Sequence, residues 1–148
     1  MPPILIDTNL LVYLYDKQSP SKANQARRVL NRLEITQSGR LSVQSLAEFL
    51  QASTHKLKPP LSRTDAQIHA TLLTRIWPVF DLTPMIVLEA ARGACDHGLA
   101  YYDAQIWASA RLNQVPTIFS EDFTDGQILE GVRFVNPFSA NFRLEDWT

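Results

Sequence analysis

The segment Pro3-Ile4-Leu5-Ile6-Asp7-Thr8-Asn9-Leu10-Leu11-Val12 decides how the whole chain is interpreted. Three apolar residues, Ile4 to Ile6, run directly into an acid, and a helical pattern begins soon after it. A short, unbroken apolar run beside turn chemistry is typical of a strand buried on both faces. Asp7 would then lie at the carboxyl end of a central strand, the edge of an open α/β sheet where ligands bind. The competing interpretation is that Asp7 only caps the helix that starts near Asn9.

Beyond this segment the chain alternates predicted strands and helices. Four further strands are predicted at 40–43, 78–82, 115–120 and within 132–138. Helices are predicted at 10–15, from Ser19-Pro20 to before Gly39, in a pair at about 44–77, at 84–97 and around Asp103. This order predicts an α/β fold with a mainly parallel sheet flanked by helices, the helical pair being inserted between strands two and three. A length of 148 residues suits one domain.

Each helix of the pair carries a set of apolar residues. In the first helix Val43, Leu46, Ala47 and Leu50 form an apolar stripe. In the second, which Ser62 is expected to cap with Asp65 three residues later, the apolar residues are Ile68, Leu72, Leu73 and Ile76. Glu48 lies on another face of the first helix, and spacing alone favours a solvated surface residue.

Composition excludes several classes of protein. Fourteen basic and fifteen acidic residues give a net charge of -1, so long-range attraction to nucleic acid is excluded as the main binding force. Any phosphate contact must be local, through a few Arg or Lys residues or a bound cation. The single cysteine, Cys95, cannot form an internal disulfide and has small neighbours typical of a buried position. With no signal peptide and no long apolar run, we expect a cytoplasmic protein without a membrane span.

Acidic residues recur where predicted strands end or helices begin. Asp122 follows the fourth strand as Asp7 follows the first, and Asp103 falls in the first turn of a helix. Clustered carboxylates repel one another unless cations or protons neutralise them. Oxygen ligands with no His or Cys beside them suit Mg²⁺ or Mn²⁺, and metal-assisted phosphodiester hydrolysis is the matching chemistry. Individually, Asp103 could serve only the helix dipole, and Asp125-Gly126 could be a simple turn.

Four motifs in order make the sequence resemble PIN-domain ribonucleases, specifically VapC-type toxins of toxin–antitoxin pairs. They are ILIDTN at the start, LAEF around Glu48, YYDAQIWASA around Asp103 and SEDFTDG around Asp122. The resemblance implies that the catalytic, metal-binding acids are Asp7, Glu48, Asp103 and Asp122, with Asp125 as an auxiliary acid. It also implies that Asn9 and Ser120 support the site or contact substrate.

The resemblance implies more about fold and partners than the residues alone do. It implies a three-layer α/β/α PIN domain over 1–148, with a five-stranded sheet in the order 3-2-1-4-5. It further implies Mg²⁺-dependent endonucleolytic cleavage of RNA, a homodimer, and an antitoxin that blocks the acidic pocket. Mn²⁺ is expected to support activity too. Candidate phosphate contacts are Arg27, Arg28, Lys56, Lys58 and Arg63.

Two alternatives also place acids at the edge of a parallel sheet. A receiver-like signalling module would use Asp81, after the third strand, as its phospho-acceptor. Strand one lacks the acid pair expected of such a module, and Val135-Asn136-Pro137 offers no lysine near the last strand. An aspartyl phosphatase with Asp7 as nucleophile would need a second acid two residues later, where Asn9 stands.

Overall fold

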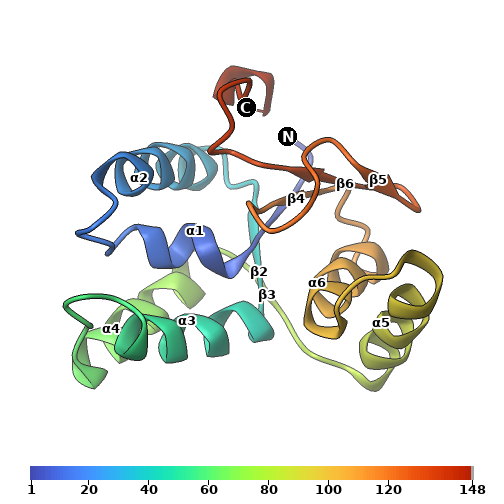
Figure 1. The fold of residues 1–148 in the computed structure, drawn as a ribbon, viewed down its shortest axis with the longest axis horizontal. Coiled ribbons are helices and arrows are strands. Elements are labelled where there is room, and N and C mark those ends of the chain that lie inside the picture. The colour runs from blue at the N-terminus through green and yellow to red at the C-terminus, as the bar shows by residue number, and fades with distance from the viewer. Residues whose placement is uncertain (148) are drawn as a thin grey trace.

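Strand β1 (Ile4–Ile6) lies inside a sheet, as its unbroken apolar sequence predicts (Figure 1). The computed structural model describes residues 1–147 and contains six strands in the order β3-β2-β1-β4-β6-β5. Neighbouring strands are parallel except β5 and β6, which pair antiparallel. The other strands are β2 (Gly39–Ser42), β3 (Val79–Phe80), β4 (Thr117–Phe119), β5 (Ile128–Leu129) and β6 (Val132–Val135).

The predicted α/β fold is confirmed, with one strand added. The five predicted strands correspond to β1 to β4 and β6, and these follow the predicted order 3-2-1-4-5. The sequence analysis misses β5, which is only two residues long and includes the exposed Ile128. Glu130 and Gly131, both with positive φ, turn the chain from β5 into β6. A strand this short has no alternating pattern to detect.

Helices cover both faces of the sheet, with α1 to α4 on one side and α5 and α6 on the other (Figure 1). Ser62 caps α4 as predicted by accepting the Asp65 N–H at 3.0 Å, and α5 ends at Gly98, whose φ is 68°. No helix formed by residues 1–147 is long and apolar enough to cross a membrane. The helices are α1 (Thr8–Tyr13), α2 (Pro20–Ile35), α3 (Val43–His55), α4 (Arg63–Ile76), α5 (Pro84–His97), α6 (Tyr101–Leu112) and the 3-10 helix Leu144–Trp147.

Two hydrophobic cores lie on opposite faces of the sheet, because successive strand residues point in opposite directions. In β1, Ile4 and Ile6 belong to the core under α1 to α4, whereas Leu5 belongs to the core under α5 and α6. In β4, Phe119 and Ile118 divide in the same way. This division confirms the predicted three-layer arrangement and explains why β1 is apolar throughout.

The apolar stripe of α3 only partly coincides with its buried face. Leu46 packs against the first core, but Val43 and Leu50 are both 39% exposed, and the fully buried residues are Ser45, Phe49 and Ser53. Phe49 provides the main apolar contact with the core, and the two serines are small enough for neighbouring backbone to approach closely. Apolar periodicity could not locate a face made of one aromatic residue and two serines.

The apolar residues of α4 are also mostly exposed, and the predicted burial of Cys95 is wrong. On α4 only Leu73 of the predicted apolar set is buried, because the helix turns the small residues Ala66 and Ala70 inward. The exposed members of that set are Ile68, Leu72 and Ile76. Cys95 is exposed as well. Helix α5 instead directs inward the residues Ile86, Ala90 and Gly93.

The C-terminal tail packs on the first core, as its large apolar residues predict. Leu144 is buried, and Phe142 and Trp147 meet the Phe119 ring edge-on at centroid distances of 5.6 and 5.7 Å. Because Phe119 ends β4, the tail supports the strand from which part of the candidate site emerges.

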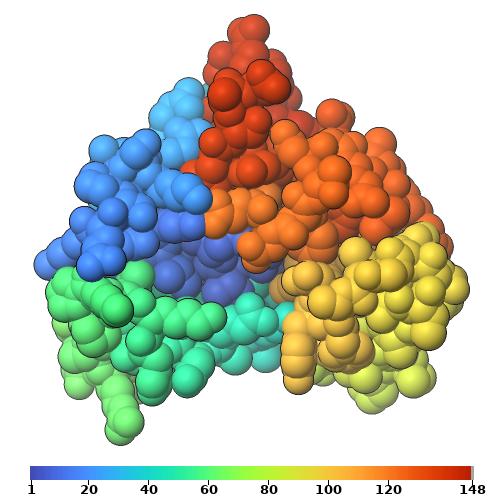
Figure 2. Space-filling model, in the orientation of Figure 1, coloured from blue at the N-terminus to red at the C-terminus, as the bar shows by residue number. Residues whose placement is uncertain are grey.

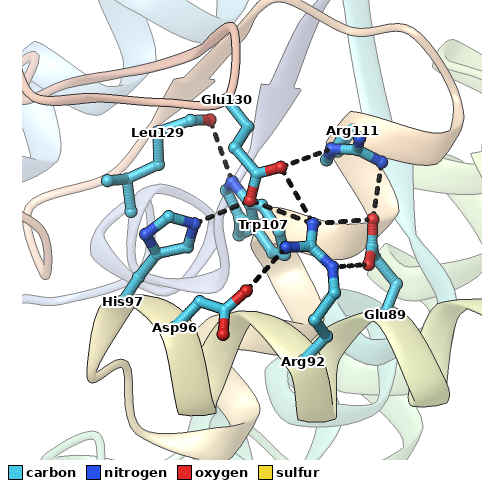
Figure 3. Close-up of polar contacts among 8 residues, drawn as sticks. All are labelled: Glu89, Arg92, Asp96, His97, Trp107, Arg111, Leu129 and Glu130. Carbon is cyan, nitrogen blue, oxygen red and sulfur yellow. Dashed lines mark hydrogen bonds and ion pairs between the residues drawn. The ribbon is translucent and has the colours of Figure 1, made fainter.

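A charge network joins α5, α6 and the β5–β6 turn (Figure 3). Its centre is Arg92, which donates to Glu89 at 2.5 Å and to Glu130 at 2.9 Å. Arg111 donates to Glu89 at 2.5 Å, so each of these carboxylates has a cationic partner. The whole network consists of Glu89, Arg92, Asp96, His97, Arg111 and Glu130.

Pairing in this network favours the ionised carboxylates. The hydrogen bond from Arg92 lowers the pKa of Glu89, and the contact with His97, at 2.7 Å, lowers the pKa of Glu130. His97 therefore has a specific acidic partner in addition to its place at the end of α5. Acids and bases in this region compensate one another.

Candidate functional site

The candidate site lies at the carboxyl edge of the two central strands. β1 and β4 are parallel neighbours with Ile6 paired to Phe119, so the residues that follow each strand emerge side by side. The Asp7 N–H donates to the Phe119 carbonyl at 3.0 Å, and Ser120 is the next residue after β4. Strand pairing therefore brings together two segments that are more than a hundred residues apart in sequence.

Asp7 is both the N-cap of α1 and the most deeply buried acid of the site, with 5% of its surface exposed. Its Oδ1 accepts the Thr8 N–H at 2.8 Å, and its Oδ2 accepts the Ser120 hydroxyl at 2.7 Å. Burial raises the pKa of the Asp7 carboxyl from 3.8 to about 7. The two hydrogen bonds lower this pKa in part, and the charges of Asp122 and Glu48 raise it further. Capping and a functional role are therefore compatible in one side chain.

Asn9 and Ser120 connect Asp7 to Asp122. The Asn9 Nδ2 donates to the Ser120 hydroxyl and to Asp122 Oδ2, both at 3.1 Å. The Asp122 N–H donates to the same hydroxyl at 3.1 Å. The Asn9 Oδ1 is buried and has no hydrogen-bond partner among the described residues. Asn9 thus has one oxygen beside the acids that no hydrogen bond uses.

Glu48 is a half-buried and oriented residue, which excludes the solvated-surface interpretation. Its Oε2 accepts the Thr8 hydroxyl at 2.8 Å, and its Oε1 accepts the Gln44 amide at 2.8 Å. Gln44 Oε1 in turn accepts the Gln105 amide of α6 at 2.8 Å. This chain of contacts ties α3 to α6, the helix that carries Asp103.

Asp103 lies in the first turn of α6 and is half-buried. Burial raises the pKa of its carboxyl, and the charges of Asp122 and Glu48 raise it further. The Gln44 amide that donates to Glu48 also donates to the Tyr102 carbonyl at 3.0 Å, so the start of α6 lies beside Glu48. Within residues 1–147, no hydrogen bond or ion pair engages the Asp103 carboxylate. It is the acid that its neighbours restrain least.

Asp125 does not take part in the contacts that connect the other four acids. Asp125 Oδ1 accepts the Asn136 N–H at 2.8 Å, and the following Gly126 has a φ of 82°, so the segment forms a turn. None of the contacts that join the other acids includes Asp125. We use "acid cluster" below for Asp7, Glu48, Asp103 and Asp122.

Sequence reasoning missed a second polar group beside the acid cluster. The Tyr13 hydroxyl donates to Glu121, and Lys22 donates to Tyr13 at 3.1 Å and to Glu121 at 2.7 Å. Lys22 thus neutralises the acid next to Asp122 and leaves Asp122 itself unpaired with a cation. The position of Glu121 beside Asp122 was the only signal in the sequence, because nothing there connects residues 13, 22 and 121.

The four acids lie in one region, and the charges of Asp122 and Glu48 raise the pKa of the other two, but the four side chains do not point toward a common position. Among residues 1–147, no three His, Cys, Asp or Glu side chains are already placed to hold one metal ion together. Asp7 is turned toward Ser120, Glu48 toward Thr8, and Asp122 toward Asn9. The donor set consists of oxygens, which in chemistry suits a hard divalent cation.

A cavity of about 410 Å³ opens next to the acid cluster. In Figure 2 the dark blue atoms of the N-terminal segment lie recessed at the centre of the visible face, between teal atoms of α3 and orange atoms that follow β4. Of the predicted phosphate contacts, Lys56 lines this cavity, whereas Arg27 and Arg28 line other hollows. The lining residues are Thr8, Asn9, Val12, Tyr13, Asp16, Glu48, Gln51, Ala52, Lys56, Leu57 and Asp122.

Comparison with known families agrees with this geometry. The sequence model of the PIN domain matches residues 4–124, from the first residue of β1 to just beyond Asp122. The chain belongs to the PIN domain family. Its match includes every member of the acid cluster and ends one residue before Asp125. No curated protein sequence matches the chain.

Solved structures resemble this PIN domain over most of their length. A toxin–antitoxin complex from Klebsiella pneumoniae matches with a TM-score of 0.68 at 17% identity, covering 91% of this chain and 98% of that chain. VapC20 of Mycobacterium tuberculosis, a toxin that cleaves the sarcin–ricin loop, matches with a TM-score of 0.62 at 19% identity, covering 88% and 98%. DNA-bound VapBC of Salmonella typhimurium matches with a TM-score of 0.65 at 15% identity, covering 90% and 97%. Identities this low support the shared fold alone.

Proposed function

We propose that this PIN-domain chain is a metal-dependent endoribonuclease and the toxin of a toxin–antitoxin pair. The observation that carries the proposal is the acid cluster at the carboxyl edge of β1 and β4. Within residues 1–147, no Lys or Arg forms an ion pair with any of its four members. Uncompensated carboxylates at one place are unfavourable unless a cation joins them.

The donor set favours Mg²⁺, with Mn²⁺ as a substitute, because both prefer oxygen ligands. Asp7, Glu48, Asp103 and Asp122 are the proposed ligands, directly or through water, and the unpaired Asn9 Oδ1 is a further oxygen beside them. When bound, the ion supplies an activated water and stabilises the oxygen that leaves. Burial and, to a smaller extent, the neighbouring acids raise the pKa of Asp7 and Asp103, so a bound cation would favour their ionised forms.

The protein's own groups would orient this chemistry. Thr8 and Gln44 hold the two oxygens of Glu48, and Ser120 holds Asp7, so these two carboxylates are fixed before substrate arrives. Asp103 has no hydrogen-bond partner within the described residues, and burial raises the pKa of its carboxyl. Its orientation is therefore not fixed in advance by hydrogen bonds, in contrast to the orientations of Asp7 and Glu48.

The proposal is tested by incubating purified protein with labelled single-stranded RNA in Mg²⁺ and in EDTA. We expect cleavage inside the RNA in Mg²⁺ and none in EDTA. Asp103→Asn should reduce cleavage to background while keeping the melting transition, since the substitution preserves shape and removes one charge. Asp81→Asn is the matched control, because Asp81 is exposed and lies outside the acid cluster. Equal cleavage by wild type and Asp103→Asn would contradict the proposal.

The proposed protein partner is a cognate antitoxin that covers the acid cluster. Several structures of the same fold are toxin–antitoxin complexes, including those from Klebsiella pneumoniae and Salmonella typhimurium. Co-expression with the product of an adjacent small gene should give a stable complex with no ribonuclease activity. A complex that cleaves RNA as fast as the free chain would contradict inhibition at this site.

We also propose a homodimer formed through exposed apolar residues of α3, α4 and the start of α5. Val43 and Leu82 line the same small hollow, so the apolar residues of α3 continue onto the segment before α5. Burying such residues against a second copy would remove apolar surface from water. The exposed members, between 37% and 71%, are Val43, Leu50, Ile68, Leu72, Ile76, Leu82, Met85 and Leu88. Sedimentation should give a dimer for wild type and a monomer for Leu72→Glu, with exposed Gln67→Glu on α4 as control.

A further inference from the structure

We propose that the cavity beside the acid cluster is a nucleotide subsite, which holds the base adjacent to the phosphate that is cleaved. This inference rests on the proposed ribonuclease function and deepens it, by assigning a substrate-contacting role to residues outside the acid cluster. Three features of the cavity carry the inference: its polarity along its length, a fixed aromatic wall, and a lysine at the end remote from the acids.

The cavity has the acid cluster at one end, an apolar middle, and an oppositely charged pair of lining residues, Asp16 and Lys56, at its remote end. α1 and α3 provide its walls, and its lining residues recur about one helical turn apart on each helix. On α3 and its C-cap these are Glu48, Ala52 and Lys56, and the first and last are eight steps, about 12 Å, apart along the helix axis. On the α1 side Val12 and Tyr13 occupy the middle. That length accommodates one nucleoside between the acids and the lysine.

Tyr13 forms a rigid wall of this cavity. Its hydroxyl is held by Glu121 and Lys22, the Lys22 ammonium lies 4.8 Å from its ring centroid, and the Phe138 ring meets it edge-on at 5.1 Å. Neither Lys22 nor Phe138 lines the cavity, whereas Tyr13 does. An aromatic ring that is already held by its neighbours loses little freedom when a base stacks on it. RNA-binding proteins hold unstacked bases in this way.

The unpaired Lys56 favours a nucleotide over an apolar side chain as the occupant, while Asp16 at the same end accepts the Gln18 N–H at 3.0 Å. Lys56 is the only basic residue among those lining the cavity, and within residues 1–147 it forms no ion pair. A nucleotide has a flat base bordered by phosphates on both sides. One phosphate would lie at the acid cluster with its cation, the base on Tyr13, and the next phosphate near Lys56. An apolar side chain would use the middle of the cavity and leave Lys56 without a partner.

The first test measures binding without cleavage, so it does not depend on the nuclease activity. Adenosine 5′-monophosphate and ribose 5-phosphate are titrated in Mg²⁺ while the methyl signals of Val12 and Leu57 are followed by NMR. We expect the nucleotide to shift these signals and to bind roughly 5- to 100-fold more tightly than the ribose phosphate, the range that stacking on one aromatic ring supplies. Equal binding of the two compounds would overturn the proposal.

Substitutions of cavity residues show which side chains cause the preference for the nucleotide. Tyr13→Phe keeps the ring and should keep the preference for the nucleotide, whereas Tyr13→Leu should abolish it. Lys56→Ala should weaken binding of both compounds, and Lys17→Ala is its control, because Lys17 is exposed and does not line the cavity. If Tyr13→Phe loses the preference as fully as Tyr13→Leu, the hydroxyl contacts and not stacking are responsible, and the stacking subsite is rejected.

The second test uses cleavage of a pool of random single-stranded RNA. The wild-type protein should prefer a particular base at a nucleotide flanking the cut. Tyr13→Leu should remove this base preference, whereas the dependence of cleavage on Mg²⁺ should stay the same. Nucleotide discrimination without any RNA cleavage would retain the subsite and reject the nuclease. Cleavage with an unchanged profile in Tyr13→Leu would retain the nuclease and reject the subsite. If Tyr13→Leu weakens only antitoxin binding, the cavity is a protein-docking site and the proposal fails.

Discussion

The charge network and the acid cluster contain the same kinds of side chain in opposite electrostatic conditions. In the network, Glu89 and Glu130 are paired with Arg92 and Arg111, and pairing lowers the pKa of both carboxyls. In the acid cluster no cationic side chain of the described chain compensates the carboxylates, and burial raises the pKa of Asp7 to about 7. One region stabilises the ionised acids, and the other disfavours them.

This difference separates a structural role from a functional one. A compensated network stabilises the positions of α5, α6 and the β5–β6 turn, and it has no need of a ligand. An uncompensated cluster costs stability in the isolated protein, and such a cost persists in folds mainly where a site requires it. Variants that change one region should therefore have effects of opposite sign to variants that change the other.

The largest expected effect in this comparison is on activity. Glu48→Gln removes one charge from the acid cluster and keeps the hydrogen-bonding capacity toward Thr8 and Gln44. We expect cleavage at limiting Mg²⁺ to fall by roughly 10²–10³-fold, the usual cost of losing one preorganised electrostatic group. Raising Mg²⁺ or Mn²⁺ should recover part of the loss. Unchanged turnover at limiting Mg²⁺ would remove Glu48 from the site.

The next effect is an increase in stability. Asp7→Asn removes a charge that burial disfavours and keeps a side chain that caps helices about as well. A pKa of about 7 against an ordinary 3.8 corresponds to at most about 4 kcal/mol, less whatever the Ser120 hydrogen bond loses. In EDTA at pH 8 the variant should melt several degrees above wild type. Excess Mg²⁺ should stabilise wild type much more than the variant.

The sign of the pH effect follows from the raised pKa of Asp7. The folded protein holds this proton more tightly than the unfolded chain, so the contribution to stability is complete below about pH 4 and is lost as pH rises toward 7. The gain from Asp7→Asn should therefore be large at pH 8 and absent near pH 4. A gain that does not change with pH would show that the charge is not its cause.

The charge network should respond in the opposite direction. Glu89→Gln leaves Arg92 and Arg111 without the carboxylate that both contact, at a cost of about 1–3 kcal/mol. The lower end applies, because both arginines partly face solvent. Because the pKa of Glu89 is lowered by folding, its contribution is present above the ordinary 4.5 and lost as pH falls through the folded value. Melting curves should show a difference at pH 7 that shrinks in acid.

The smallest effect should come from the rim of the network. Asp96 contacts only Arg92, at 3.0 Å, and its side chain is 55% exposed. Exposed pairs at this spacing on a helix contribute little, so Asp96→Asn should change the melting temperature by less than about 2 °C. A change as large as that of Glu89→Gln would mean that the network depends on its exposed members as much as on its centre.

Strand topology explains why sequence reasoning could expect Asp7 and Asp122 to lie at one edge of the sheet. The apolar run of β1 fixes its place in the sheet, and parallel pairing with β4 places Asp7 beside Ser120 and Asp122. Asp103 and Glu48 needed the resemblance between motifs, because helix spacing alone gave each an adequate structural explanation. Their positions follow from contacts such as Gln44 with Gln105, which no local pattern specifies.

What the sequence could not give was the side of each helix that meets the core. On α3 the buried face is Ser45, Phe49 and Ser53, and the apolar residues Val43 and Leu50 are outside. Periodicity shows that a helix has an apolar face. It does not show whether that face is buried in the core or exposed for association with another protein. The contacts of Lys22 with Tyr13 and Glu121 were missed for a different reason, since each arises from tertiary packing alone.

The separation of the two cores by the sheet has a consequence for how this protein can lose function. Asp7 and Glu48 belong to elements that pack on the first core, whereas Asp103 rests on α6 of the second. Proteins open locally in cooperative units, at free energies well below that of global unfolding. Opening of either half would separate the acids while the other half stayed folded. The acid cluster is therefore assembled only while both halves are folded. On heating, we expect activity to be lost at a lower temperature than the one at which the whole chain unfolds.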